Sequence, residues 1–280
     1  MSKPNFIVIG AARCATTSLH KYLQNHPDIF LSDPKEINYF SKDRFYTKGE
    51  KWYLAHFDEA KTKAIGEAST SYTSAPNIEN APLRIKTDLG SDIKFIYIVR
   101  DPIERMLSHY THYIMRGQKI ESLDRIIEDK THSIVVQGKY AYQLSLYLAH
   151  FDKENFKVIT VEQLKKEPVN TMESLYHFLE IAPNATFDNE VHNNNTEFKE
   201  MTHFGKALMQ FYNHHFEHLA PPSIVKRTLE KLARLGGDTF QKPKLTEEQI
   251  IELRQFYKDD MIKFKEDWGI DLYSRWNVNK

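Results

Sequence analysis

The stretch FIVIGAARCATTSL, residues 6–19, decides the fold, because it leads from an apolar run through small residues into a helical pattern. The run FIVI at 6–9 is short, rich in branched residues and bounded by glycine, which is typical of a strand buried in a sheet. Gly10 permits a sharp exit from that strand. The sequence therefore predicts a strand, a tight loop and a helix, an order that builds binding sites for anions.

The start of the following helix, within TTSLHKYLQNH, carries the chemistry of such a site. Thr16, Thr17 and Ser18 are suited to capping the first turn, where backbone N–H groups have no partner within the helix. These N–H groups and the helix dipole favour a phosphate at one point. Arg13 adds a permanent positive charge beside that point.

A loop for nucleotide triphosphates is the first alternative, and the residues disfavour it. That motif is G-x-x-x-x-G-K-[ST], whereas Ala15 and Thr16 stand here where the second glycine and the lysine would be. No later strand pattern ends in an exposed aspartate that could hold a metal. We therefore expect a phosphate-like ligand without magnesium–ATP, and keep a nucleotide kinase or hydrolase as the alternative.

Composition bounds the size and the partners of the protein. Its 280 residues are 41% hydrophobic and include 38 basic and 38 acidic residues, so that the formal net charge is zero. A chain of this size can bury a full core, and we expect a single α/β domain over residues 1–280. The balanced charge gives no reason to expect nucleic acid or an anionic membrane surface as a partner.

Cysteine content and hydropathy indicate the compartment. Cys14 is the single cysteine, so no disulfide can form within the chain, as suits a reducing cytoplasm. The apolar run near the N-terminus is too short for a membrane span. We therefore expect a cytoplasmic protein.

His214 and His218 have the spacing of metal ligands on a helix, but no carboxylate or cysteine pattern completes a site, and we expect no metal.

Strands alternate with helices through the first part of the chain. This alternation is typical of a mostly parallel sheet flanked by helices, whose ligands bind at the carboxyl ends of the strands. Beyond 6–9, strands are expected at 29–31, 63–69, 93–100 and 156–162, and helices at 103–117 and 140–151.

The last third, from about residue 170, shows only helix and loop patterns. Loop signals occur at 193–196 and 221–222, and a last helix opens with a capping box formed by Thr246 and Gln249. We expect this part to cover the active site.

A second candidate segment is IKFIYIVRDPIERMLSHYTHY, residues 93–113. An expected strand ends at Arg100, and Pro102 suits the first turn of the helix that follows. Ser108 and His112 are four residues apart and so share a face of that helix. An arginine and a hydroxyl placed in this way can bind a second phosphate.

A third segment is SDPKEINYF, residues 32–40, in which Lys35 and Glu36 lie between a proline and two aromatic residues. A glutamate beside an apolar wall can serve as a base. Without further context, a lysine–glutamate pair is more often plain solvated surface.

These three segments together resemble the sulfotransferases that use 3′-phosphoadenosine-5′-phosphosulfate (PAPS), in particular the bacterial and glycan-type branch related to heparan sulfate sulfotransferases. The opening motif of that family, IGxxKxGTTxL, is matched by IGAARCATTSL, and its Arg-Asp-Pro segment with a helix serine by Arg100 and Ser108. Its Lys-Glu loop with two aromatic residues is matched by KEINYF at 35–40. GEASTSY and GKYAYQL are weaker matches to two further motifs.

The resemblance implies transfer of a sulfuryl group from PAPS to a hydroxyl or amine, with 3′,5′-adenosine bisphosphate (PAP) as product and no metal required. Glu36 would take the proton of the acceptor. Arg13, assisted by Lys35, would hold the sulfuryl oxygens and the leaving oxygen. His112 would orient Glu36 or the acceptor, and Tyr140 is expected to line the acceptor pocket.

The resemblance also implies that the donor is held at both of its phosphates. Arg100 and Ser108 would bind the 3′-phosphate and so select PAPS over ATP. The 5′-phosphosulfate would bind in the first loop, whose candidate residues are Arg13, Cys14, Ala15, Thr16, Thr17 and Ser18.

Three positions depart from the family pattern: Arg13 replaces a lysine, Ala15 a glycine and Ala68 a lysine. Arg13 can still neutralise charge, but it cannot donate a proton, because its pKa exceeds about 12. Ala15 is expected to crowd the phosphate. A catalytically impaired nucleotide-binding protein is therefore a further alternative.

The acceptor is expected to be a small molecule, a lipid or a saccharide, and the sequence does not define the oligomeric state.

Overall fold

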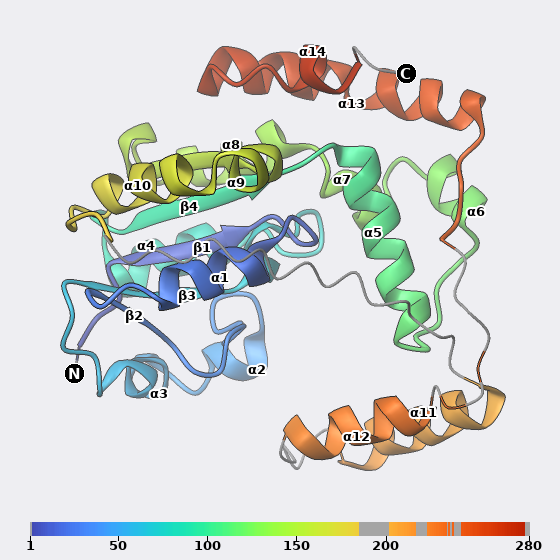
Figure 1. The fold of residues 1–280 in the computed structure, drawn as a ribbon, viewed down its shortest axis with the longest axis horizontal. Coiled ribbons are helices and arrows are strands. Elements are labelled where there is room, and N and C mark those ends of the chain that lie inside the picture. Colours follow the sequence, from blue (N-terminus) through green and yellow to red (C-terminus); the bar gives the residue numbers. More distant parts are fainter. Residues whose placement is uncertain are drawn as a thin grey trace.

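The structure is a computed structural model that describes residues 2–184, 202–216, 223–233, 235, 237 and 242–277. Its centre is a five-stranded sheet in the order β2-β3-β1-β4-β5, in which all neighbouring strands are parallel (Figure 1). The strands are β1 (Phe6–Gly10), β2 (Ile29–Leu31), β3 (Ala64–Ala68), β4 (Lys94–Val99) and β5 (Phe156–Thr160). The predicted α/β fold with a parallel sheet is confirmed, and each strand lies where the sequence placed it.

The strand β1 occupies the middle of the sheet. Phe6 is paired with Gly66 of β3 on one side and with Lys94 of β4 on the other. All five residues of β1 are buried, as expected of a parallel strand whose two faces are both covered by helices. The register brings the ends of β1, β3 and β4 to one edge, where the binding site is expected.

Helices account for most of the remaining chain. They are α1 (Thr16–Gln24), α2 (Asp43–Tyr46), α3 (Glu50–Leu54), α4 (Ala81–Leu89), α5 (Pro102–Met115), α6 (Leu123–Glu128), α7 (Ser133–Val136), α8 (Tyr140–Leu148), α9 (Val161–Lys166), α10 (Pro168–Phe178), α11 (His203–Phe216), α12 (Ser223–Ala233), α13 (Glu247–Trp268) and α14 (Leu272–Asn277). The 3-10 helices are η1 (Ala55–Phe57), η2 (Thr70–Thr73) and η3 (Lys153–Asn155).

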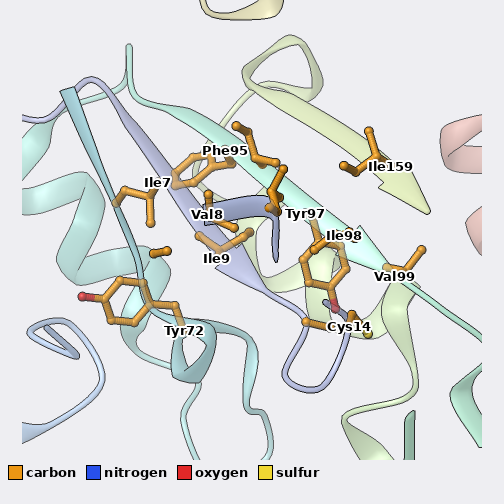
Figure 2. Close-up of a cluster of buried hydrophobic side chains, with 14 of the residues drawn as sticks. Ile7, Val8, Ile9, Cys14, Tyr72, Phe95, Tyr97, Ile98, Val99 and Ile159 are labelled. Atoms are coloured by element: carbon orange, nitrogen blue, oxygen red, sulfur yellow. The ribbon is translucent and has the colours of Figure 1, made fainter. Parts of the chain in front are cut away.

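Helices flank the sheet along β1 and β4. Figure 1 shows α8, α9 and α10 beside β4 and α1 beside β1. The ring of Tyr176 in α10 packs on His26, just after α1, with ring centroids 4.5 Å apart. The helix α5 stands at the edge of the sheet to which β1 leads, and α13 lies above α8 in this view, on the side away from β4. Figure 2 shows the core between these layers, in which Val8, Phe95 and Tyr97 pack together and Cys14 lies where β1 gives way to its loop.

Helix boundaries follow the sequence closely with one exception. The capping box at Thr246 and Gln249 is formed as predicted. The prediction that hydroxyls cap α1 is wrong: Ala15 is the N-cap residue, and no side chain bonds to the first turn. The physical reason is that the left-handed Ala15 turns the chain so that Thr16 is already within the helix.

Two sequence expectations concern membrane spans and loop signals. None of the described helices is long and apolar enough to cross a membrane. The loop signals at 193–196 and 221–222, and His218, lie outside the described residues.

Candidate active site

The loop between β1 and α1, residues 11–15, is called the β1–α1 loop below. Just before this loop, the backbone of Gly10 lies very close to two side chains. A Cβ on Gly10 would collide with Oγ1 of Thr73 and the ring of Tyr97. The Thr73 hydroxyl instead donates to the carbonyl of Ile9 at 2.8 Å. The N–H of Ala11 donates to the carbonyl of Ile98 at 2.8 Å and ties the loop to β4. Only glycine therefore fits at position 10.

The β1–α1 loop leads into a helix whose first N–H groups have no acceptor within the helix. Arg13 and Ala15 have left-handed φ angles of 70° and 55°. The first intrahelical bond runs from the N–H of Leu19 to the carbonyl of Ala15, so the N–H groups of the three preceding helical residues have no helical acceptor. Such N–H groups form a concave site for an anion.

Cys14 does not contribute to this set as the sequence suggested. Its N–H donates to the carbonyl of Ala11 at 3.2 Å, and its side chain is fully buried. Burial raises the pKa of the Cys14 thiol to about 11. The thiol therefore stays protonated and packs in the core, near the hydroxyl of Tyr140.

The helix α5 is fixed at its start by Asp101. One carboxylate oxygen accepts the N–H groups of Ile103 and Glu104 at 2.8 and 3.1 Å, which is N-cap geometry. The other pairs with Arg254 of α13 at 3.2 Å. The helix is thereby anchored to the C-terminal part of the chain and held with one face toward the β1–α1 loop.

That face of α5 brings together three predicted site residues. Nε of Arg13 donates to Oγ of Ser108 at 3.3 Å, and Nη1 of Arg13 lies 3.3 Å from Nδ1 of His112. Because a guanidinium can only donate, Nδ1 of His112 must accept, and the ring proton is on Nε2. Burial and the charges of Arg13 and Arg116 lower the pKa of His112 to about 4. His112 is therefore a neutral hydrogen-bond donor rather than a base.

Arg100 lies against the same loop from the end of β4. Its Nη1 donates to the carbonyl of Arg13 at 3.4 Å, and its Nη2 forms an ion pair with Glu104. Burial opposes the charged form, but the hydrogen bond and negative charge of Glu104 outweigh it and raise the pKa of Arg100. The guanidinium of Arg100 thus lies against the β1–α1 loop with Glu104 as its ion-pair partner.

Sequence reasoning missed a second arginine–histidine pair behind the loop. Arg105 is fully buried, contacts Nδ1 of His109 at 3.2 Å and donates to the carbonyl of Ile134, while its Nε has no hydrogen-bond partner. Among the described residues, no carboxylate forms an ion pair with it. With Arg116 and His112, these residues follow one stripe of α5 at spacings of three and four, a signal that the sequence did contain.

These arginines interact with one another electrostatically. Partial desolvation and the charges of Arg116, Arg100 and Arg105 lower the pKa of Arg13. Like charges gathered in one place are unfavourable until an anion compensates them. The positive charges gathered around Arg13 therefore favour the binding of an anion.

The second loop, residues 32–42 between β2 and α2, is called the β2–α2 loop and carries Glu36. Lys35 Nζ lies 2.5 Å from Oε1 of Glu36. Thr70, the first residue of η2, donates its N–H to Oε2 at 2.9 Å and has its hydroxyl 3.2 Å from Oε1. Glu36 itself has a left-handed φ of 66°. The carboxylate is therefore held in a defined orientation at the carboxyl end of the sheet.

The structure thus groups the predicted residues into two clusters. Arg13, Arg100, Ser108 and His112 form one, and Lys35 and Glu36 form the other. Among the described residues, no hydrogen bond joins Glu36 to His112, so the expected orientation of Glu36 by this histidine is not seen.

The placement of Tyr140 corrects the expectation from the sequence. Its side chain is completely buried, and its hydroxyl donates to the carbonyl of Arg100 at 2.8 Å. A residue enclosed in this way cannot line the acceptor pocket. It supports the end of β4 instead, from a helix whose first N–H groups, those of Ala141 and Tyr142, are bound by Asp260 of α13.

No metal site is present in the part of the chain that the structure describes. No three histidine, cysteine, aspartate or glutamate side chains there are grouped in a way that could hold a metal ion.

A parallel α/β sheet with an anion-binding loop after its first strand defines a class of enzymes that handle phosphate-bearing donors. The family model described as "Sulfotransferase domain" matches residues 3–265. The chain belongs to the sulfotransferase family, and the family resemblance found in its sequence is confirmed.

Curated relatives agree with this assignment. The membrane-associated sulfotransferase kil1 of Dictyostelium discoideum is 45% identical over 120 residues, which are 41% of this chain and 24% of that protein. Human heparan sulfate glucosamine 3-O-sulfotransferase 3B1 is 27% identical over 278 residues, 96% of this chain and 64% of that protein. The chain spans about a quarter of the length of the first relatives it matches.

Solved structures show the same fold. A sulfotransferase from Alicyclobacillus acidocaldarius superposes with a TM-score of 0.70 at 21% identity, covering 98% of this chain and 99% of that one. Mouse sulfotransferase SULT7A1, complexed with PAP, gives a TM-score of 0.56 at 16% identity and covers 97% and 88% of the two chains.

Proposed function

We propose that this protein transfers the sulfuryl group of PAPS to a hydroxyl or amine of a saccharide acceptor, with Glu36 as the base. The observation that carries the proposal is the contact of Arg13 with both Ser108 and His112, because it joins the loop for the 5′-phosphosulfate to the helix for the 3′-phosphate. A saccharide is favoured over a small molecule or a lipid because of the similarity to a heparan sulfate sulfotransferase.

The residues present fit a doubly phosphorylated donor. The free N–H groups of the first turn of α1 suit the 5′-phosphate. Arg100 and Ser108 each contact Arg13, and a guanidinium and a hydroxyl are the groups that suit a 3′-phosphate. The unpartnered Nε of the buried Arg105 indicates an excess of positive charge behind the loop.

In the proposed reaction the acceptor oxygen or nitrogen attacks sulfur in line with the bridging oxygen of the donor. A bond from the acceptor to sulfur forms while the sulfur–oxygen bond to the phosphate breaks, and PAP leaves with the electron pair. Glu36 takes the proton of the acceptor. Arg13 and the Nε2–H of His112 stabilise the negative charge that develops on the sulfuryl and leaving oxygens.

Lys35 has to change partners in this reaction. It is paired with Glu36 in the free protein, and a base must be free to receive a proton. The sulfuryl oxygens of a bound donor are an alternative partner for the ammonium group. Donor binding is therefore expected to precede productive acceptor binding.

The test is the Glu36→Gln variant, assayed with labelled PAPS and a panel of saccharide, lipid and small-molecule acceptors. Turnover should fall about 10²–10⁴-fold, the usual contribution of a general base, while the affinity for PAP stays unchanged. The control is Glu59→Gln, which alters an exposed glutamate. Unchanged turnover of Glu36→Gln would remove this residue as the base.

The alternatives predict different nucleotide ligands, so they can be separated by measuring the shift in melting temperature with PAP and with ATP–magnesium. Selective stabilisation by PAP supports the proposal, and stabilisation by ATP–magnesium alone would support a nucleotide kinase or hydrolase instead. PAP binding without transfer to any acceptor would indicate a catalytically impaired nucleotide-binding protein.

A further inference from the structure

The buried glutamate of β3, Glu67, is the feature of the molecule that the proposed function leaves unexplained. Its side chain is fully buried next to the β2–α2 loop. Three hydroxyls donate to its carboxylate: those of Tyr53 at 2.8 Å, Tyr72 at 2.9 Å and Ser69 at 2.6 Å. No cation among the described residues pairs with it. Burying a carboxylate with hydroxyl partners alone is costly, which indicates a role beyond packing.

Two of these three hydroxyls also hold the backbone of the β2–α2 loop. Oγ of Ser69 accepts the N–H of Asn38 at 3.0 Å, and the hydroxyl of Tyr72 accepts the N–H of Phe40 at 3.4 Å. The hydroxyl of Tyr53 binds the same oxygen of Glu67 as Tyr72 does. Among the described residues, no N–H of the loop donates to the Tyr53 hydroxyl.

The charge of Glu67 decides the direction of these hydrogen bonds. A hydroxyl has one proton, and a carboxylate can only accept. The protons of Ser69 and Tyr72 therefore point at Glu67, and their lone pairs are left to accept N–H groups of the loop. A protonated or amide side chain at position 67 would itself donate to one hydroxyl, whose own proton would then turn toward the loop N–H and break that contact.

The loop residues held in this way determine where Glu36 lies. Asn38 has a left-handed φ of 56° and donates from Nδ2 to the carbonyl of Glu36 at 2.5 Å. Oγ of Ser71 donates to Oδ1 of Asn38 and fixes the orientation of that amide. Asn38 thus connects the hydroxyl of Ser69 to the backbone of Glu36, and its left-handed conformation depends on these bonds.

We infer that Glu67 is a positioning residue, whose carboxylate orients the Ser69 and Tyr72 hydroxyls so that they hold the loop that presents Glu36. This inference rests on the proposed function, because it takes Glu36 as the base. It assigns no contact between Glu67 and the substrates.

A pH dependence follows from the same geometry. Burial is the main cause that raises the pKa of Glu67 to about 7, and the negative charge of Glu36 adds to it. The other titratable groups that face Glu67 are Tyr53, Tyr72 and Tyr147, whose pKa values are raised well above 10, so that they stay protonated. As the pH falls through about 7, Glu67 takes up a proton, and the hold on the loop is expected to weaken.

The experiment compares Glu67→Gln, Ser69→Ala and Tyr72→Phe with the matched control Tyr53→Phe. Two readouts are measured: kcat with the affinity for PAP, and amide hydrogen exchange of Asn38 and Phe40. The first three variants should lower kcat about fivefold to tenfold, the equivalent of one lost hydrogen bond, at unchanged PAP affinity. Exchange should accelerate at Asn38 in Ser69→Ala, at Phe40 in Tyr72→Phe, and at one or both in Glu67→Gln.

The control removes the same kind of buried hydroxyl without releasing the loop. Tyr53→Phe should therefore keep wild-type kcat and wild-type exchange at both amides. In the wild type kcat should fall as the pH drops through about 7, and this step should be absent in Glu67→Gln. Conservative Glu67→Asp keeps the charge and should restore part of the kcat.

Several outcomes would overturn the inference. Equal losses in Tyr53→Phe and Tyr72→Phe would show that the cluster only contributes stability. Wild-type exchange at both amides in Glu67→Gln would show that the charge does not orient the hydroxyls. Should Glu67→Gln fail to fold, the two hydroxyl variants still decide the question. The exchange readout does not depend on turnover, so failure of Glu36→Gln to lose activity would count against the proposed function alone.

Discussion

The β1–α1 loop and the β2–α2 loop lie at the same edge of the sheet and have a similar backbone conformation. Each has two non-glycine residues in the left-handed region, separated by one residue: Arg13 and Ala15 in the first, Glu36 and Asn38 in the second. Left-handed residues other than glycine cost energy and are found where the surrounding structure enforces them, often at functional sites. The likeness ends with the backbone.

The two loops differ in how their charges are compensated. Among the described residues, Arg13 forms no ion pair, and three more arginines lie close enough to lower its pKa. The carboxylate of Glu36 is bound by Lys35 and Thr70. The first loop therefore keeps positive charge available for a ligand, whereas the second is satisfied within the protein and has to exchange a partner before it can act.

The largest effect is expected from removing the uncompensated charge. Arg13→Met should lower turnover about 10²–10³-fold, the usual cost of losing one donor that stabilises developing charge, whereas Arg13→Lys keeps the charge and should retain most of the activity. Steady-state kinetics with labelled PAPS measure this. Arg116→Met, which alters the exposed arginine at the C-cap of α5, is the control, and an equal loss there would mean that only the bulk charge of the region matters.

A smaller effect is expected for the donor's second phosphate. Arg100→Ala should weaken PAP binding about 10–100-fold, because charge-assisted hydrogen bonds contribute about 1.5–3 kcal/mol, and should change AMP binding little. Calorimetric titration with both nucleotides measures this. Glu104→Gln removes the competing partner of Arg100 and should leave PAP affinity unchanged or tighter. Equal losses for PAP and AMP in Arg100→Ala would contradict the assignment of the 3′-phosphate site.

Titration of His112 sharpens the comparison further. Its pKa of about 4 in the folded protein is below the ordinary value of 6.5, so between these values the unfolded chain binds a proton that the folded one does not. Its contribution to stability is therefore present above pH 6.5 and is lost as the pH falls through 4. In Arg13→Met the pKa should rise toward 6.5, as followed by NMR of the ring protons. An unchanged value would mean that burial and the charge of Arg116, without Arg13, lower the pKa of His112.

The smallest effect concerns the backbone of the β1–α1 loop. Ala15 occupies a left-handed conformation that glycine adopts without cost. Ala15→Gly should therefore raise the free energy of unfolding by up to about 1 kcal/mol and open the site, giving somewhat tighter PAP binding. Urea unfolding and calorimetry measure these. A destabilised variant would show that the methyl group of Ala15 contributes to packing.

The sheet and the first loop could be predicted because their signals are local. The run at 6–9 and the apolar stretch before Arg100 are short, branched and bounded by turn residues, and such runs form strands regardless of distant context. Only the family resemblance put Arg13 and Ser108 in one donor site, and their hydrogen bond across 95 positions was not predicted.

The support of Glu36 could not be predicted in the same way. It depends on Thr70 and Ser69 lying opposite residues 36 and 38 across the turn after β3, which follows from the register of β2 and β3 rather than from a local pattern. Tyr140 was misplaced for a related reason: the sequence shows an aromatic residue at the start of a helix but not which way its hydroxyl points.

The contacts of α13 have a consequence for the synthesis of the protein. Asp260 binds the start of α8, whose Tyr140 supports Arg100, and Arg254 binds Asp101 at the start of α5. Residues near position 100 thus obtain their final partners from residues beyond position 250. A ribosome will have made nearly the whole domain before the nucleotide site can close, so nascent chains shorter than about this length should not be retained on immobilised PAP.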